Sequence, residues 1–468
     1  MTTERSARNL LAPAFLGAYA SATALAQPTA ALVLASAPLA ALLCCWTFLD
    51  SGRWLLLFFS ATLLLPALPL SWGGSGLHPA VVVALLGVLA GLARLSWLWF
   101  TPDLLGWALL EYTTVLGASV CIAALYSGAE IAGGSLARVA LFSISIYVFF
   151  YVKGTHTFAG ESFRAVRLLY WVAVIAALFA CADFYFQFPA PAGFGQQFVW
   201  METGVYRRAQ GLFYDASALG NFCAFFLVMI AVSLIRRRSE TPVSRAGLLT
   251  GGLVFFAALL FSYSRASLLN VLAAVAVLLF LERRRLRLRR LSVFLVACGA
   301  GSAAAYFLLP ALANVYWLRL FQSFQYFSSA TGAVLSGRLD SWRVLTEFLV
   351  DHPWHALLGV GYKTLPYSNF VGQRVIADNM YLSMLVETGL LGLASLLFLN
   401  FAILRTSWKA RQSADSRRWF YGTWILCFWA GQMVQMLSQD VLTYWRVLPI
   451  YFCMLALAAR QDNEHSLP

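Results

Sequence analysis

Charged residues are scarce in this sequence: Asp, Glu, Lys and Arg make up 11% of the 468 residues, against roughly 25% in soluble globular proteins. Hydrophobic residues make up 61%, and long apolar runs recur from Leu10 to Ala459. A helix needs ~20 such residues to cross a bilayer core of about 30 Å. The composition excludes a soluble enzyme. It also excludes an outer-membrane barrel, because runs such as 81–89 are apolar on every face. We expect an all-α polytopic membrane protein.

Histidine and cysteine are too few and too scattered to suggest a metal centre. The 5 His residues form no ligand-like cluster. The 8 Cys residues all fall within predicted membrane spans, where a thiol behaves as a small hydrophobic group. No CxxC pattern or disulfide is suggested. We therefore expect no bound metal and no cofactor.

The net charge of +13 is distributed unevenly along the chain. We place 23 of the 33 Lys and Arg residues on one side of the membrane, whereas the acidic residues divide about evenly. The positive-inside rule makes the basic side cytoplasmic. The basic runs are then topology signals and contacts to anionic lipids, and no nucleic-acid partner is expected.

The apolar pattern predicts 14 membrane spans, or 12 if short neighbours are re-entrant, with both termini in the cytoplasm. Arg5 and Arg8 followed by Ala24-Leu25-Ala26 also resemble a cleavable signal peptide. We favour an uncleaved first helix because another span begins just after Pro28. The predicted spans are 10–26, 29–48, 54–71, 79–98, 104–126, 134–152, 166–187, 216–235, 246–263, 266–281, 291–309, 380–404, 419–437 and 447–459.

A long loop on the outer side, residues 311–379, interrupts this rhythm, and loops of this length usually carry function. Apolar residues recur at helical spacing over 317–327 and again over 339–349, which predicts two amphipathic helices. The second should end before Pro353 and pair Arg343 with Glu347. Packing on the helix bundle and lying on the membrane surface both remain open for these helices.

Several arginines stand near the outer membrane surface, where a charge is costly unless it is paired or functional. Arg265 lies in a polar break between two spans, beside Ser264 and two further serines. Snorkelling to lipid phosphate is the alternative to a functional role for Arg265. Arg207 and Arg208 precede the span at 216, and a guanidinium fork suits a phosphate. Arg338, at the start of the second loop helix, could serve a salt bridge or a ligand equally well.

Two further polar sites lie at the last long span. Asp378 and Asn379 directly precede it, and Asp378 could simply cap the helix, as Asp215 could cap the span at 216. Glu387 lies ~13.5 Å deeper along the helix, where a carboxylate needs a partner or a function. Gly389 and Gly392 should allow close helix packing.

These motifs occur in an order that resembles the O-antigen ligase and polymerase family, membrane transferases that act on undecaprenyl-diphosphate-linked glycans. The resemblance covers roughly 207–404. Its parts are Arg208-Ala-Gln-Gly-Leu-Phe-Tyr-Asp215 with Leu219-Gly220, Ser264-Arg265, Arg338 with Trp342, Pro353 with Gly359-Val-Gly361, and Asn379 through Gly389-Leu-Leu-Gly392.

The resemblance implies a type C glycosyltransferase-like helical bundle in the bacterial inner membrane, with its active site facing the periplasm. It implies that Arg208 and Arg265 hold the donor diphosphate and that the loop residue before the last long span activates the acceptor hydroxyl. Ligases of this family typically carry His followed by Asn, Ser or Gln there, whereas this chain has Asp378-Asn379. The expected catalytic residues are therefore Asp378 and Arg265. The expected substrate-binding residues are Arg207, Arg208, Arg338, Asn379 and Ser264.

The implied partners are an undecaprenyl-diphosphate-linked glycan, a glycan or lipid-A-core acceptor, and membrane lipids. We divide the chain into N-terminal helices (1–206), a catalytic region (207–404) and C-terminal helices (405–468). A polymerase and a ligase are both compatible with the sequence. A lipid-linked oligosaccharide flippase or exporter and a non-catalytic subunit of a polysaccharide assembly complex remain alternatives. The sequence does not determine the oligomeric state.

Overall fold

The structure, a computed structural model, describes residues 52–66, 71–72, 75–76, 78–93, 103–155, 162–189, 195–201, 204–213, 215–236, 241–283 and 338–460. The predicted spans 10–26, 29–48 and 291–309 and the amphipathic helix over 317–327 lie outside these residues.

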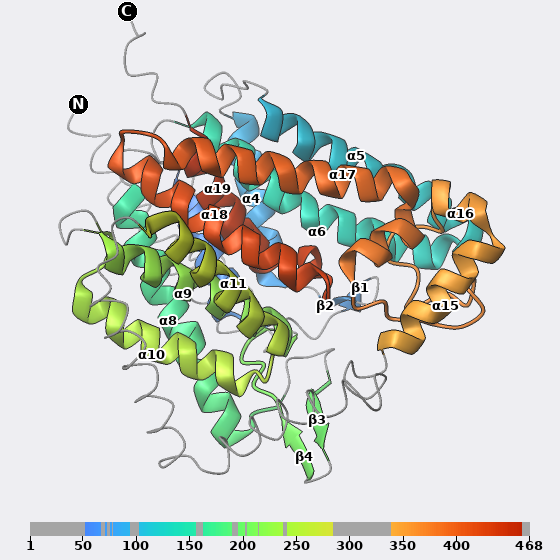
Figure 1. Cartoon of the computed structure of the whole chain (residues 1–468), viewed down its shortest axis with the longest axis horizontal. Helices are drawn as coiled ribbons and strands as arrows, with labels where there is room; N and C mark the ends of the chain where they lie inside the picture. Colours follow the sequence, from blue (N-terminus) through green and yellow to red (C-terminus); the bar gives the residue numbers. More distant parts are fainter. Residues whose placement is uncertain are drawn as a thin grey trace, which may run out of the picture.

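Helices account for most of the described chain (Figure 1). The helices are α3 (Arg53–Leu64), α4 (Pro79–Ala93), α5 (Leu104–Ser127), α6 (Ala129–Gly154), α8 (Ser162–Phe186), α9 (Ala216–Ile235), α10 (Arg245–Phe261), α11 (Arg265–Glu282), α15 (Arg338–Asp351), α16 (Pro353–Leu358), α17 (Met380–Arg411), α18 (Ser416–Met436), the 3-10 turn η3 (Val441–Thr443) and α19 (Leu448–Ala459).

The long helices form a bundle in which α5, α6 and α17 lie side by side and α11 and α17 both pack on α18 (Figure 1). Six described helices are long and apolar enough to cross a membrane: α5, α6, α8, α9, α11 and α17. Each coincides with a predicted span, although α17 continues to Arg411, beyond the predicted end at 404. The prediction of a multi-pass, mostly helical membrane protein is confirmed.

Two short hairpins are the exception to the all-helical expectation. Strands β1 (Ser71–Trp72) and β2 (Ser75–Gly76) pair between α3 and α4, and β3 (Phe198–Met201) and β4 (Gly204–Arg207) pair between α8 and α9. Both pairs are antiparallel. They belong to connections between helices, so the core of the molecule remains a helix bundle.

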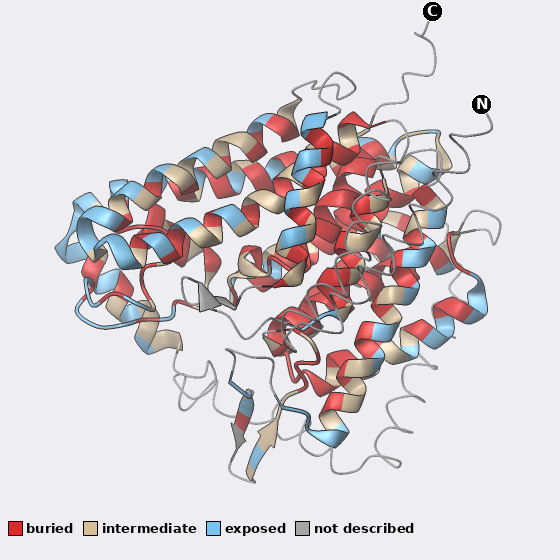
Figure 2. Cartoon of the chain, turned by 180° about the vertical axis from the view of Figure 1, so that it is seen from behind, coloured by how far each residue is buried: buried red, intermediate tan, exposed pale blue. Residues whose placement is uncertain are grey.

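Buried residues line the inner faces of the helices (Figure 2), and they include aromatic side chains and a polar network between α11 and α18. Phe225 of α9 packs on Trp424 of α18 with ring centroids 4.3 Å apart. The amide of Asn270 donates to Gln432 and Gln435 at 3.0 and 2.9 Å. Hydrogen bonds between membrane helices each contribute about 0.6–2 kcal/mol. This network therefore helps to fix α11 against α18.

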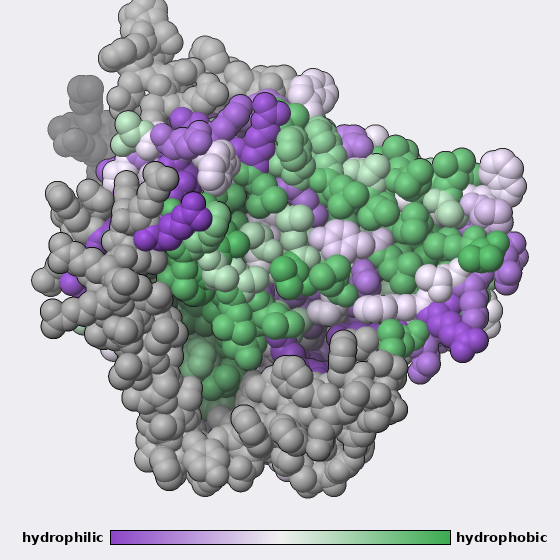
Figure 3. All heavy atoms as spheres, in the orientation of Figure 1, coloured by the Kyte–Doolittle hydropathy of each residue, from purple (hydrophilic) through white to green (hydrophobic). Residues whose placement is uncertain are grey.

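Cationic side chains gather at both ends of the bundle. We call the end where α9, α11 and α17 begin and where α15 and α16 lie the loop end. At the opposite end Arg236 binds Ser416, Arg411 pairs with Glu282 at 2.9 Å, and Arg460 donates to the Thr155 carbonyl. Apolar surface covers the middle of the face seen in Figure 3, and hydrophilic side chains lie toward its right-hand end.

The helix predicted over 339–349 is present as α15, which ends at Asp351, before Pro353. The predicted pair of Arg343 and Glu347 forms at 2.7 Å. Leu345 and Phe348 of α15 are buried in a small core with Val360 and Val386. α15 therefore packs on the connecting loop and on α17 through this small core.

Candidate functional site

The polar break between α10 and α11 is a tight turn that places the partly buried Arg265 at the start of α11. Ser264 caps α11: its Oγ accepts from the Ser267 amide at 3.3 Å and lies 2.8 Å from the Ser267 hydroxyl. The Ser262 hydroxyl donates to the Leu259 carbonyl. Tyr263 has a φ of 50°, a conformation that non-glycine residues seldom adopt. The serines thus shape the turn, and Arg265 extends from its end.

Arg208 joins this turn to the beginning of α9. Its Nε donates to the Ser262 carbonyl at 2.8 Å, and a terminal nitrogen donates to the Ser217 hydroxyl at 3.2 Å. Asp215 caps α9 by accepting from the Ser217 amide at 2.9 Å, as the sequence allowed. Arg208 is therefore held beside the segment that carries Arg265.

Arg207 is engaged elsewhere. Its guanidinium pairs with Asp183 of α8 at 2.9 Å, with side chains only 7% and 4% exposed, and also donates to the Phe188 carbonyl. Asp183 in turn accepts from the Gly211 amide. Successive side chains of a strand point to opposite faces, so these neighbouring arginines diverge. Arg207 therefore joins the β3–β4 hairpin to α8. The structure does not bring Arg207 together with the other arginines that the sequence predicts to bind substrate.

Arg338, the first residue of α15, pairs with Asp378 at 3.1 Å. One turn further along α15, the indole of Trp342 donates to the Ala377 carbonyl at 2.6 Å. Asp378 itself has a φ of 45°. Such conformations cost of order 1–3 kcal/mol and persist where the surroundings hold them, often at functional sites. The two contacts from α15 supply that restraint.

Asn379, and not Asp378, caps α17. The Asn379 Oδ1 accepts from the amides of Tyr381 and Leu382 at 3.1 and 3.2 Å. The capping explanation for Asp378 is therefore wrong, and its half-exposed carboxylate is directed to Arg338 instead. Partial burial raises the pKa of the Asp378 carboxyl above its usual range, although the ion pair with Arg338 opposes this shift.

The structure brings three of the predicted arginines together. Arg265 interacts electrostatically with both Arg208 and Arg338. We call these three residues the arginine cluster. Asp378 lies against it through Arg338, and Tyr444 interacts with both Asp378 and Arg208. Like charges held this close favour an anion between them, and two or more guanidinium forks are suited to phosphate oxygens.

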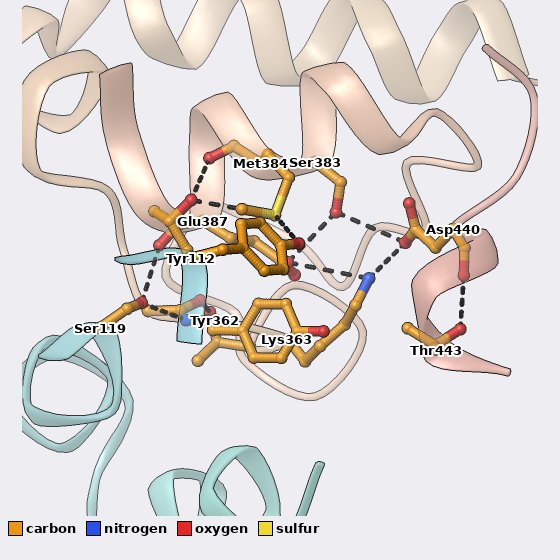
Figure 4. A network of polar contacts seen from close by, with 12 residues as sticks. Tyr112, Ser119, Tyr362, Lys363, Ser383, Met384, Glu387, Asp440 and Thr443 are labelled. Carbon is orange, nitrogen blue, oxygen red and sulfur yellow. Dashed lines mark hydrogen bonds and ion pairs between the residues drawn. The ribbon is translucent and has the colours of Figure 1, made fainter. Parts of the chain in front are cut away.

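A second charged group, which we call the lysine cluster, surrounds the carboxylate predicted to need a partner (Figure 4). Glu387 of α17 is 1% exposed and lies 3.9 Å from the Lys363 ammonium. Lys363 also binds Asp440 directly. The Ser383 hydroxyl donates to Glu387 at 3.1 Å. Sequence reasoning identified Glu387 alone, because Lys363 and Asp440 stand in connecting segments where no periodic pattern marks them.

Gly389 breaks α17 just beyond Glu387, with a φ of 71°. The amides of Val360 and Gly361 donate to the carbonyls of Val386 and Glu387 at 3.0 and 2.8 Å. A Cβ at Gly389 would lie 2.2 Å from the Leu357 carbonyl oxygen. Leu357 belongs to α16, so Gly389 lets the end of that helix approach α17 closely, as the sequence predicts. Two separate glycine motifs of the sequence, Gly359-Val-Gly361 and Gly389, meet at this joint.

Within the described part of the chain, no three His, Cys, Asp or Glu side chains are placed to hold a metal ion. His352, the next proton acceptor to consider after Asp378, stacks on Phe348 at the far end of α15. α15 has 14 residues, so His352 stands about 20 Å along the helix from Arg338.

The fold and site define a multi-pass helical membrane protein with a cationic polar site at one end of its bundle. A family model described as O-antigen ligase matches residues 249–397, from α10 into α17. This match covers about a third of the chain and confirms the resemblance to the O-antigen ligase family expected from the sequence. The match includes Arg265, Arg338 and Asp378, whereas Arg208 precedes it. A comparison with curated proteins finds no match.

Proposed function

We propose that this protein transfers a glycan from an undecaprenyl-diphosphate-linked donor to a hydroxyl acceptor, as an O-antigen or exopolysaccharide polymerase or ligase. The loop end would then face the periplasm, with the basic opposite end in the cytoplasm. The whole chain would cross the inner membrane 12 to 14 times in a type C glycosyltransferase-like arrangement. The domain match supports a glycosyltransferase-like enzyme in general, and the arginine cluster is the observation that carries the finer proposal.

The arginine cluster provides the electrostatics for this reaction. The acceptor oxygen forms a bond to the anomeric carbon while the bond from that carbon to the diphosphate oxygen breaks. The electron pair leaves with the lipid diphosphate, so negative charge grows on the leaving group. Fixed guanidinium groups in a partly dehydrated site stabilise such a charge. Arg208, Arg265 and Arg338 therefore bind the diphosphate in this proposal, and no metal ion is needed.

Asp378 is the proposed general base. It takes the proton of the acceptor hydroxyl as the new bond forms, which requires an approach within about 3 Å. An aspartate is normally a weak base, since its reference pKa is about 3.9. The raised pKa of the Asp378 carboxyl brings it closer to a useful value. Ser264 and Asn379 cap α11 and α17 on either side of the site, so we propose that they act by positioning.

The test is substitution of Arg265 in membranes supplied with an undecaprenyl-diphosphate-linked glycan. Arg265→Ala should abolish transfer while the protein remains folded and abundant. Arg265→Lys should also lose most activity, because a point charge lacks the bidentate geometry. Arg343→Ala removes an exposed loop-end arginine that pairs only locally with Glu347, and it should transfer normally. Normal transfer by Arg265→Ala at normal abundance would return Arg265 to a snorkelling role.

Glycan profiling of a strain lacking the protein would separate the two forms of the reaction. Free long chains that never reach their acceptor indicate a ligase. Single repeats on the lipid indicate a polymerase. Unchanged glycans would contradict the proposed function itself.

A further inference from the structure

A small cavity opens beside the arginine cluster at the loop end. Its volume is about 230 Å³, below the ~300–1000 Å³ of pockets for drug-sized ligands. It therefore has room for one small ring and not for a chain. The polar and aromatic residues of its wall include Arg138, Asp215, Tyr362, Tyr367, Thr443 and Tyr444.

Tyr362 gives this cavity a polar group that can contact a ligand. The residue is 2% exposed, and its hydroxyl makes no hydrogen bond to the other residues drawn in Figure 4. Its backbone amide is fixed by the Ser119 hydroxyl at 2.8 Å. Burial raises the pKa of Tyr362 to about 12, so the neutral phenol can both donate and accept. Tyr362 lines the cavity, so its hydroxyl is placed to exchange hydrogen bonds with a molecule bound there.

Arg138 supplies a cation to the same cavity from α6. Its guanidinium lies over the Tyr367 ring, 4.5 Å from the centroid, and interacts electrostatically with the Tyr362 hydroxyl. No acidic side chain of the described chain forms an ion pair with it. Stacking uses the face of the guanidinium, so its N–H edge can still donate hydrogen bonds. A cation part-way along a membrane-facing helix is usually functional.

We propose that this cavity binds one sugar ring of the acceptor glycan, an assignment that rests on the proposed transfer function. The aromatic walls fit the apolar face of a sugar ring, and the Arg138 edge and the Tyr362 hydroxyl fit its hydroxyl groups. Sites for small ligands usually have a mostly apolar wall with a few polar groups that orient the ligand.

The position of the cavity favours the acceptor over the donor. None of its lining residues belongs to α11 or α15, which carry Arg265 and Arg338. Asp215 and Tyr444, in contrast, line the cavity and interact with Asp378 or its surroundings. A ring held there directs a hydroxyl toward the proposed base, while the diphosphate occupies the arginine cluster.

The experiment measures ligand binding directly, so that it does not depend on turnover. The full-length protein in nanodiscs is mixed with methyl glycosides of glucose, galactose, N-acetylglucosamine and glucuronic acid, and saturation transfer to the ring protons is recorded. Inorganic phosphate is titrated as a competitor. The variants are Arg138→Ala, Arg138→Lys, Tyr362→Phe and, as matched controls, Arg265→Ala and Arg343→Ala.

We expect at least one glycoside to bind the wild type, about tenfold or more weaker binding by Arg138→Ala, and a smaller loss for Tyr362→Phe. Arg265→Ala and Arg343→Ala should bind as the wild type does. Arg265→Ala therefore separates the ideas: loss of transfer with retained glycoside binding supports both, and retained transfer with retained binding contradicts only the role of Arg265. Glycoside binding by a wild type that shows no transfer would contradict only the proposed function.

Three results would overturn the assignment. These are the absence of binding by all four glycosides, equal binding by Arg138→Ala and wild type, and displacement of every glycoside by phosphate, which would identify an anion site. If Arg138→Ala fails to fold, Tyr362→Phe and Arg138→Lys provide the test. Binding of the glycosides as tightly as by the wild type in both variants would reject the cavity as a sugar site.

Discussion

The arginine cluster and the lysine cluster lie at the same end of the bundle but differ in charge balance and in burial. In the lysine cluster one ammonium stands among two carboxylates, and Glu387 is almost fully buried. In the arginine cluster Arg265 is repelled by both Arg208 and Arg338, and the adjoining Asp378 is 43% exposed. A buried, mutually paired group holds structure together. A partly open group with excess charge of one sign is suited to bind a ligand of the opposite sign.

The two clusters meet at the α17 boundary. Asp378 precedes α17 and pairs with α15, whereas Glu387 lies inside α17 and anchors the loop that carries Lys363. The lysine cluster and the Gly389 joint therefore fix the loop whose last residues include Asp378. Substitutions in the two clusters should separate function from stability.

Next to the loss of transfer in Arg265→Ala, the largest effect is expected at Asp378. Asp378→Asn keeps the size of the side chain but removes a titratable group, so transfer should fall by ~10² to 10⁴ while stability stays unchanged. Asp378→His should recover part of the rate, because an imidazole titrates near pH 6.5. The order of activity should be Asp, His, then Asn and Ser at equal membrane abundance. Full activity of Asp378→Asn in a reconstituted assay would remove Asp378 from the mechanism.

Lys363→Met should show the opposite profile. It leaves the buried Glu387 and the partly buried Asp440 as neighbouring carboxylates without their shared cation, and breaking a buried pair in this way costs about 3–5 kcal/mol of stability. Thermal unfolding in detergent and membrane abundance measure the loss. Combining Lys363→Met with Glu387→Gln and Asp440→Asn should restore much of it. If the single variant were as stable as the wild type but inactive, the lysine cluster would belong to the catalytic machinery.

Acidity provides a third way to separate the clusters. A general base acts only when ionised, and the pKa of the Asp378 carboxyl is raised by burial. Transfer should therefore decline as the pH falls, beginning above the ordinary aspartate value of about 3.9, by about tenfold per pH unit below the raised pKa. The residual rate of Asp378→Asn should lack this decline. A wild-type profile matching that of Asp378→Asn would assign the proton transfer to another group.

The smallest effect is expected from chelation. If the arginine cluster alone stabilises the diphosphate, purified protein should keep its full transfer rate in EDTA. Loss of activity that returns on adding a divalent metal would contradict the arginine-only mechanism. Asp378 and Asp215 would then become the candidate ligands.

Much of the fold could be predicted because local patterns specify it. The bounds of α9 were predicted correctly, and those of α5 and α11 to within one residue, because an apolar run bounded by polar residues defines a membrane helix. The stop of α15 before Pro353 follows from the local chemistry of proline. The hairpins escaped prediction because strands of two to four residues leave no measurable periodicity.

The candidate site was predictable only in part. Sequence position marked Arg208, Arg265 and Arg338 as charges in need of an explanation, but it marked Arg207 equally. Strand geometry turned Arg207 toward Asp183. Between Asp378 and Asn379, the sequence could not assign the cap, since both residue types are good caps. In the structure Asp378 has a left-handed backbone conformation, and its neighbour Asn379 caps α17.

The sequence by itself determined the membrane class, the bounds of several helices and the order of the family's motifs. These properties depend on composition and on spacing within single helices. Only the tertiary structure decided which charges meet: Arg338 with Asp378 across 40 positions, and Lys363 with Asp440 across 77. Contacts between residues so far apart in the sequence form only when the helices pack. The packing energy is spread over the whole interior, so the sequence pattern of one segment does not specify these contacts.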